Sequence, residues 1–139
     1  MSESQDAVVA SGAGRARAIV AGHGSFAAGL VSAVEQITGR GNLLVPVAVT
    51  GLGAEDIERT LRRLMAETGA RVIFTDLQAG SCSMAARRLL RGHPDALLIC
   101  GTNLPVLLDF VFADEMAPTE AARHAAERGR AAISVVGGA

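Results

Sequence analysis

The chain of 139 residues has no tryptophan, no tyrosine and only four phenylalanines. Aromatic residues make up 3% of the sequence and hydrophobic residues 50%, so the core must be built mainly from Ala, Val, Leu and Ile. This composition favours layered α/β structure over an all-β sandwich, because sandwiches draw heavily on aromatic residues. A chain of this length holds one hydrophobic core, and we expect a single domain.

Lysine is also absent: the 13 basic residues are all arginines, and 14 acidic residues leave a net charge of -1. The sequence therefore offers no basic stripe for a phosphate backbone, and we expect no nucleic-acid partner. The two cysteines, Cys82 and Cys100, have neither the spacing of a zinc motif nor the number for a disulfide framework. We expect reduced thiols and no metal.

Long apolar runs are missing too. No uncharged stretch approaches the roughly 18 residues that a membrane-spanning helix needs. The first six residues are polar and acidic, whereas a secretory signal has a basic start and an apolar run. These features predict a cytoplasmic protein.

Short apolar runs alternate with helical patterns after residue 17. Residues 1–17 lack periodicity and are predicted to be a flexible leader, and residues 18–139 are predicted to form one α/β domain. The predicted strands are residues 18–21, 43–49, 71–75, 96–100 and, more weakly, 131–136. Apolar residues at helical spacing predict amphipathic helices from Phe26 to Ile37 and from Ile57 to Met65, which end at Gly39 and Gly69.

Three more helices follow. Ser81 is predicted to cap the third, Asn103 the fourth, and Pro118 to open a fifth that ends at Gly129. Strands that alternate with helices predict a doubly wound, mostly parallel sheet with right-handed crossovers. Pro46 cannot donate a ladder hydrogen bond, so its strand should lie at the edge, as it does in the strand order 2-1-3-4.

In this order, ligands bind between the first and third strands. The first strand runs into His23 and the third into Asp76, and neighbouring strands lie about 4.8 Å apart, so the two side chains could meet. A carboxylate on one ring nitrogen leaves the other free as a nucleophile. The amides of Gly80, Ser81 and Cys82, at a helix N-terminus, would favour an anion there. Together these residues predict a phosphohistidine site.

Simpler roles exist for each of these residues. His23 could be a loop residue, and Asp76 and Ser81 could act only as helix caps. Cys82 could have a depressed thiol pKa at the helix N-terminus, although a small buried residue is the favoured interpretation.

Three segments carry a family resemblance. The run Ile19-Val20-Ala21-Gly22-His23-Gly24-Ser25-Phe26-Ala27-Ala28-Gly29-Leu30 resembles the opening of the EIIA domain of the mannose-family sugar phosphotransferase system. Thr75-Asp76-Leu77 with Gly80-Ser81 and Gly101-Thr102-Asn103-Leu104-Pro105 resemble its second and third signatures. The resemblance covers about residues 18–130, with the segments in the family's order and spacing.

The resemblance implies a phosphoryl carrier. His23 would accept a phosphoryl group from the carrier protein HPr and pass it to a histidine of an EIIB partner, upstream of the membrane subunits EIIC and EIID. Asp76 would orient the imidazole through Nδ1, and Ser81 with nearby amides would hold the phosphoryl oxygens. Residues 103–105, Asn103, Leu104 and Pro105, would help wall the site. No cofactor or metal is implied.

The family is typically a homodimer whose last strand, here residues 131–136, crosses to the partner's sheet. Gln78 and Ala79 depart from the commoner signature and resemble galactosamine-type members. A regulatory binding protein that is switched by phosphorylation would need the same site and stays an alternative. A histidine phosphatase is disfavoured, because Gly22 stands where that chemistry needs arginine.

Overall fold

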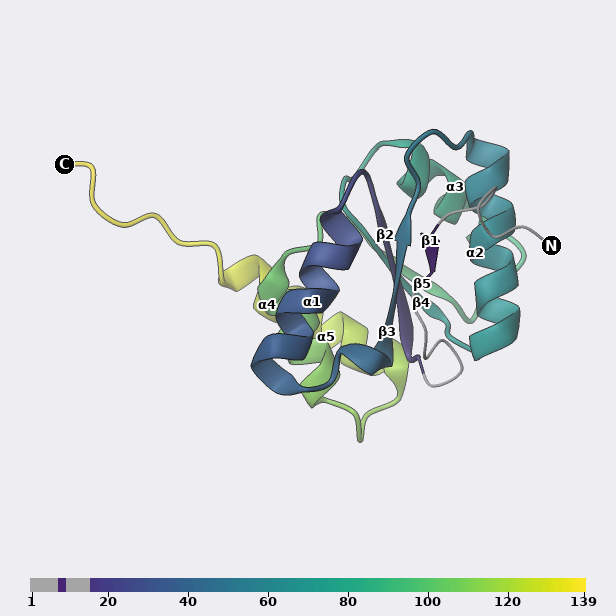
Figure 1. Cartoon of the computed structure of the whole chain (residues 1–139). Coiled ribbons are helices and arrows are strands. Elements are labelled where there is room, and N and C mark those ends of the chain that lie inside the picture. The colour runs from purple at the N-terminus through teal and green to yellow at the C-terminus, as the bar shows by residue number, and fades with distance from the viewer. Residues whose placement is uncertain (1–7, 10–15) are drawn as a thin grey trace.

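The computed structural model describes residues 8–9 and 16–139. Its strands are β1 (Val8–Val9), β2 (Ala18–Gly22), β3 (Leu44–Ala48), β4 (Val72–Thr75) and β5 (Leu97–Ile99). Its α-helices are α1 (Phe26–Thr38), α2 (Ala54–Thr68), α3 (Ser81–Leu90), α4 (Leu104–Phe112) and α5 (Pro118–Ala131), and a 3₁₀ turn, η3 (Gly41–Leu43), precedes β3. The elements form three layers with the sheet in the middle (Figure 1).

The sheet has the order β1-β3-β2-β4-β5. The four longer strands are parallel, and their order confirms the predicted 2-1-3-4 arrangement. Pro46 lies opposite Val20 in the parallel pair. The prediction that its strand lies at the edge holds for the parallel part only, because Val8 and Val9 pair antiparallel with Ala48 and Val47 on its outer side.

The short strand β1 falls within the predicted leader, and no pattern in the sequence indicated it. Most of residues 1–17 lie outside the described residues, so the leader boundary stays a prediction. Ala16 and Arg17 already belong to the folded body: Ala16 is buried, and the Arg17 amide donates to the Leu43 carbonyl at 2.7 Å.

Alternate residues of the central strand β2 feed two separate cores. Ile19 and Ala21 pack against α2 and α3, while Ala18 and Val20 pack against α1, α4 and α5. All five residues of β2 are buried, as expected for a parallel strand that is covered on both faces. The end of β2 is therefore held rigidly where the candidate site begins.

The helix ends test the predicted caps. Gly39 and Gly69 end α1 and α2 with φ of 73° and 76°, as predicted. The Asn103 side chain caps α4 and accepts a hydrogen bond from the Val106 amide, which confirms that prediction. The prediction for Ser81 is wrong by one residue: Gly80 is the N-cap of α3, and Ser81 is the first helical residue.

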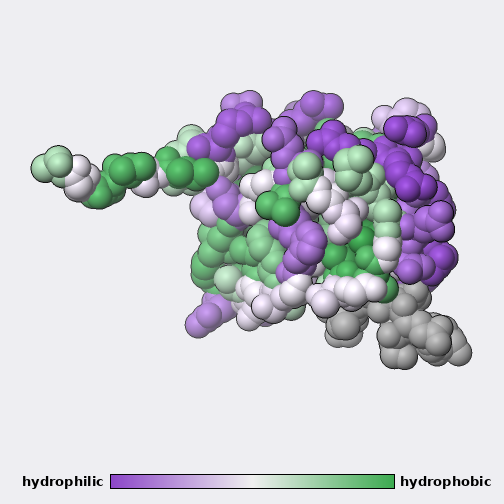
Figure 2. Space-filling view, turned by 90° about the horizontal axis from the view of Figure 1, so that it is seen from above, coloured by the Kyte–Doolittle hydropathy of each residue, from purple (hydrophilic) through white to green (hydrophobic). Residues whose placement is uncertain are grey.

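The predicted strand at residues 131–136 is wrong for this chain taken alone. Helix α5 extends past the predicted end at Gly129 to Ala131, and residues 133–139 form no strand. This tail stands away from the body, and Figures 1 and 2 show it as an extended and largely hydrophobic segment. Ile133, Val135 and Val136 are 74%, 94% and 91% exposed. Within the described part of the chain, no helix has the length and apolarity to cross a bilayer.

Candidate phosphohistidine site

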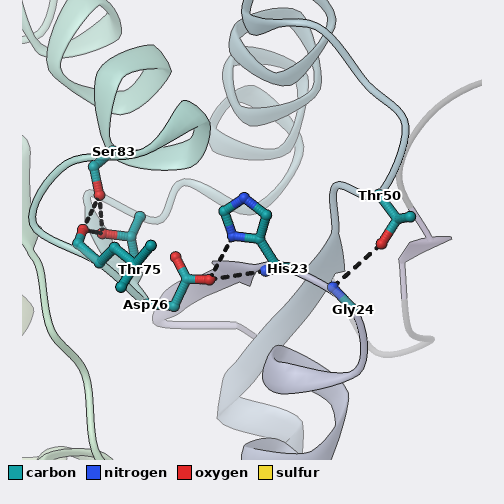
Figure 3. A network of polar contacts seen from close by, with 7 residues as sticks. His23, Gly24, Thr50, Thr75, Asp76 and Ser83 are labelled. Atoms are coloured by element: carbon teal, nitrogen blue, oxygen red, sulfur yellow. Dashed lines mark hydrogen bonds and ion pairs between the residues drawn. The ribbon is translucent and has the colours of Figure 1, made fainter.

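The site lies where the neighbouring strands β2 and β4 end. Ala21 pairs with Thr75, so the first residues beyond the two strands, His23 after β2 and Asp76 after β4, enter adjacent loops. The His23 ring nitrogen Nδ1 is 2.8 Å from Asp76 Oδ2. The backbone amide of His23 donates to the same oxygen at 2.9 Å (Figure 3). The structure thus brings together the two residues that the sequence pairs.

The two members of this pair differ in exposure. The Asp76 side chain is 11% exposed and that of His23 is 53% exposed. Burial raises the pKa of Asp76, but the hydrogen bonds from the His23 ring and backbone amide outweigh it, and the pKa lies below its ordinary value. Asp76 is therefore a carboxylate at neutral pH. It accepts from Nδ1, and the second ring nitrogen points away from it (Figure 3).

Gly22 makes room for this contact. A Cβ at this position would lie 2.5 Å from Phe26 Cδ2 and 3.1 Å from Asp76 Oδ2. Any side chain here would push against the carboxylate that holds His23. Close packing therefore explains why position 22 is a glycine, which the spacing of the sequence motif did not reveal.

The loop that contains His23 and Gly24 is held by a residue from the turn after β3. Gly24 has a φ of 54°, in the left-handed region that glycine adopts readily, and its amide donates to Thr50 Oγ1 at 3.2 Å. Thr50 was not among the predicted site residues. Its role could not be found from a local motif, because it is 26 residues away in the chain.

A buried hydroxyl pair fixes the loop that carries Asp76. Thr75 Oγ1 lies 2.7 Å from Ser83 Oγ, and Ser83 donates to the Leu77 carbonyl (Figure 3). Both side chains are fully buried. The sequence analysis did not identify Ser83. Its position two residues after the start of α3 would have indicated an inward-facing hydroxyl, but only once the helix start was known.

The predicted anion-binding residues lie beside the imidazole. A Cβ placed on Gly80 would be 3.8 Å from His23 Cε1, so the start of α3 approaches the ring. Ser81 is half-buried and is the first residue of α3 rather than its N-cap. Phosphate binding by Gly80, Ser81 and Cys82 stays a prediction.

Cys82 is completely buried, which confirms the favoured interpretation. The alternative of a depressed thiol pKa is wrong: burial and the nearby negative charge of Asp76 raise the pKa of Cys82 to about 12. Desolvation therefore outweighs the position near the helix N-terminus.

The turn at residues 103–105 is tied into the helical layer. Asn103 Oδ1 accepts from the Val106 amide at 3.0 Å, and Asn103 Nδ2 donates to the Gly129 carbonyl at 3.0 Å. The Thr102 amide binds the Thr75 carbonyl at 3.0 Å, which places this turn next to the end of β4. The Asn103 side chain thus joins α4 to α5, and the predicted wall formed with Leu104 and Pro105 stays a prediction.

A second pair with similar geometry lies elsewhere. His124 Nδ1 is 2.9 Å from Asp109 Oδ2, between α5 and α4. His124 is exposed. This pair provides a natural control for the pair at the strand ends.

A parallel sheet that presents a carboxylate-bound histidine where its strand order reverses defines a class of α/β proteins suited to group transfer on an imidazole. The comparisons with known proteins name the family. Residues 17–127 match the family model EIIA-man, described as the PTS system fructose IIA component. The chain belongs to this family of EIIA components of the sugar phosphotransferase system (PTS), and membership implies phosphoryl transfer in sugar uptake.

Individual relatives agree. The chain is 36% identical over 96 residues to the sorbose-specific EIIA component of the PTS of Klebsiella pneumoniae, which covers 68% of this chain and 71% of the relative. It shares the fold of the mannose/sorbose-specific IIA subunit from Enterococcus faecalis, with a TM-score of 0.74, 16% identity, and coverage of 88% of this chain and 96% of that one. The EIIA component from Streptococcus agalactiae has a TM-score of 0.69 at 22% identity, with coverage of 81% and 93%.

Proposed function

We propose that His23 is the phosphoryl acceptor of this chain. It would take the group from phospho-HPr and pass it to a histidine of an EIIB protein. The observation that carries the proposal is the double hydrogen bond from His23 to Asp76 Oδ2, at 2.8 Å from the ring and 2.9 Å from the amide. With Nδ1–H bound to the carboxylate, Nε2 keeps its lone pair for attack on phosphorus.

Each transfer breaks one phosphorus–nitrogen bond and forms another, so no cofactor is needed. The bond between phosphorus and the donor imidazole of HPr breaks as a bond from phosphorus to His23 Nε2 forms, and the second transfer to EIIB repeats this exchange. The positive charge that develops on the His23 ring is offset by Asp76, which stays ionised. The amides at the start of α3, around Gly80 and Ser81, would hold the phosphoryl oxygens. The proposal includes the cytoplasmic location predicted from the sequence.

The test is phosphorylation of the intact chain with phosphoenolpyruvate, enzyme I and HPr, followed by mass spectrometry and phosphorus NMR. We expect one acid-labile phosphoryl group on the wild type and none on His23→Ala. His124→Ala is the matched control, because it removes the other carboxylate-bound histidine, and it should be labelled normally. Labelling of His23→Ala would refute the assignment. A labelled chain that passes its phosphate to no EIIB would favour the regulatory alternative.

The proposal also includes a homodimer with exchanged tails. Strand β5 ends the order of the described sheet, and a groove of about 400 Å³ runs beside it, lined in part by Leu98, Val106 and Ile133. Ile133, at the start of the exposed apolar tail, belongs to this lining, and the same segment of a second copy has the apolar character to pair with β5. In this dimer, residues 131–136 of a second copy would occupy the groove beside β5.

Size-exclusion chromatography with light scattering tests the exchange. The full chain should be a dimer, and a variant that ends at Ala132 should be a monomer that keeps its helical circular dichroism. The substitution Val135→Glu should weaken the dimer without shortening the chain, because it would put a charged side chain in place of an apolar one within the exchanged segment. A dimer that survives both changes would contradict the exchange.

A further inference from the structure

A thiol lies next to the two polar residues of the candidate site. One potential metal-ligand atom from each of His23, Asp76 and Cys82 lies within 4.8 Å of the other two. Asp76 and Cys82 come from the loop after β4 and the start of α3, and His23 comes from the loop after β2. An imidazole nitrogen, a carboxylate oxygen and a thiolate sulfur are the three kinds of ligand that zinc uses in proteins.

The spacing suits a small tetrahedral ion. Bond lengths of about 2.0 Å to nitrogen or oxygen and 2.3 Å to sulfur require ligand atoms roughly 3.3 to 3.6 Å apart. Separations of at most 4.8 Å reach this range with shifts of about 1 Å, which side-chain rotation supplies. The exposed side of His23 provides the entry path, because more than half of that side chain is open to solvent.

We propose that His23, Asp76 and Cys82 form a binding site for a thiophilic divalent cation of the zinc class, and that the bound ion blocks the imidazole. The effect on phosphorylation rests on the proposed function, whereas the binding of the ion does not. Three protein ligands leave the fourth position to water, as in open zinc sites. On binding, the Cys82 sulfur bonds to the ion and its proton leaves to solvent.

The ion would take over an existing contact of the site. His23 Nδ1 lies 2.8 Å from Asp76 Oδ2, so an ion bound to Nδ1 would replace the proton there. That proton would move to Nε2, which would lose the lone pair that attacks phosphorus. The ion also competes for the imidazole with the phosphoryl group, so phosphorylation and metal binding exclude each other.

Binding is tested by titrating the reduced full chain with Zn²⁺ in a calorimeter and with Co²⁺ in an absorbance spectrometer. We expect one Zn²⁺ per chain and, with Co²⁺, a charge-transfer band that reports a thiolate ligand. Cys82→Ser should abolish the band and weaken binding by at least about 100-fold, since even indirect partners of metal ligands contribute about 10- to 100-fold. Cys100→Ser is the matched control and should bind as the wild type does.

A second variant would separate the loss of a metal ligand from a loss of folding. Cys82→Ala is the second variant if serine disturbs the buried position, and circular dichroism shows which variant is folded. Wild-type affinity in a folded Cys82 variant, or no binding of micromolar Zn²⁺ by the wild type, would overturn the proposal.

Competition is tested in the phosphorylation assay with and without Zn²⁺. Zinc should stop labelling of the wild type, and a chelator should restore it. The labelling rate of Cys82→Ser, whatever its value without zinc, should be the same with and without zinc. The variant also controls for zinc acting on enzyme I or HPr. Zinc binding without any labelling would refute the proposed function and leave the metal site standing. Labelling of the wild type without zinc binding would do the reverse.

Discussion

Replacing Gly22 with alanine tests whether the site depends on close packing behind His23. The new methyl group would lie 2.5 Å from Phe26 Cδ2 and 3.1 Å from Asp76 Oδ2. The first distance is far inside van der Waals contact, so the phenyl ring at the start of α1 must move. The second moves the oxygen that accepts both hydrogen bonds from His23. The substitution therefore affects stability and function by separate routes.

The magnitude follows from two opposing effects. Removing a glycine from a strand stabilises the folded state by roughly 0.5 to 1 kcal/mol, because the unfolded chain loses conformational freedom. Overpacking a filled site destabilises it by typically about 1 to 3 kcal/mol. We therefore expect Gly22→Ala to lower the free energy of unfolding by about 0 to 2.5 kcal/mol. The phosphorylation rate should fall as well.

Gly29→Ala isolates the packing contribution. Gly29 lies on the exposed face of α1, and a Cβ there would meet nothing within 4 Å. This substitution should stabilise the chain by up to about 1 kcal/mol. The difference between the two variants then measures the clash at Gly22, which we expect to be about 1 to 3 kcal/mol.

Urea unfolding followed by circular dichroism measures both variants under the same conditions. Phosphorylation by HPr provides the second readout, in which Gly29→Ala should match the wild type. Equal midpoints for the two variants, together with wild-type labelling of Gly22→Ala, would refute the argument that Gly22 is required by packing against Asp76.

The remaining predictions concern the polar contacts. Asp76→Asn should lower the rate of labelling by about 10- to 100-fold, since a charge-assisted hydrogen bond contributes roughly 1.5 to 3 kcal/mol, and Asp109→Asn should leave the rate unchanged. Because the pKa of Asp76 is lowered in the folded state, its ionised carboxylate stabilises the fold at pH values above the ordinary aspartate pKa of about 3.9. Urea midpoints measured at decreasing pH should show that the wild type loses its extra stability over Asp76→Asn as the pH falls through the lowered pKa of Asp76. Ser83→Ala should cost about 1 to 3 kcal/mol in urea unfolding, because it removes a buried partner of the Leu77 carbonyl, and unchanged midpoints and labelling would show that this hydroxyl does not position the loop.

The sequence predicts the contact between His23 and Asp76 because this contact depends only on which strands are neighbours in the sheet. Once β2 and β4 are neighbours, the residues that follow them must meet, and His23 and Asp76 do. The positions within α3 were harder to predict. The helix starts at Ser81 rather than after it, and a shift of one residue turns a helix by about 100°. Neither the inward direction of Ser83 nor the position of the Cys82 thiol could be read without the true start.

Other differences have their cause outside local sequence patterns. Strand β1 is two residues long and owes its conformation to the edge of β3 rather than to its own pattern. Residues 131–136 carry the apolar character of a strand, yet a strand needs a neighbour, and the described part of the chain provides none for this segment. The sequence pattern therefore indicated the need for a partner, and we read the missing strand as part of the exchange proposed above.

The two carboxylate-bound histidines show why a short contact alone does not define an acceptor. His124 and Asp109 meet at 2.9 Å, almost the distance in the pair at the strand ends. Asp76, however, accepts from both the ring and the backbone of His23, which fixes the side chain as well as its tautomer. Asp109 is twice as exposed as Asp76, 21% against 11%, and Arg128 lies 3.7 Å from its other oxygen, so its charge is shared and screened. The start of α3 also lies against His23, where its amides can hold an anion, whereas His124 lies within α5, away from any helix N-terminus of its own. Because of these differences, rather than the contact distance, we expect His23 and not His124 to carry the phosphoryl group.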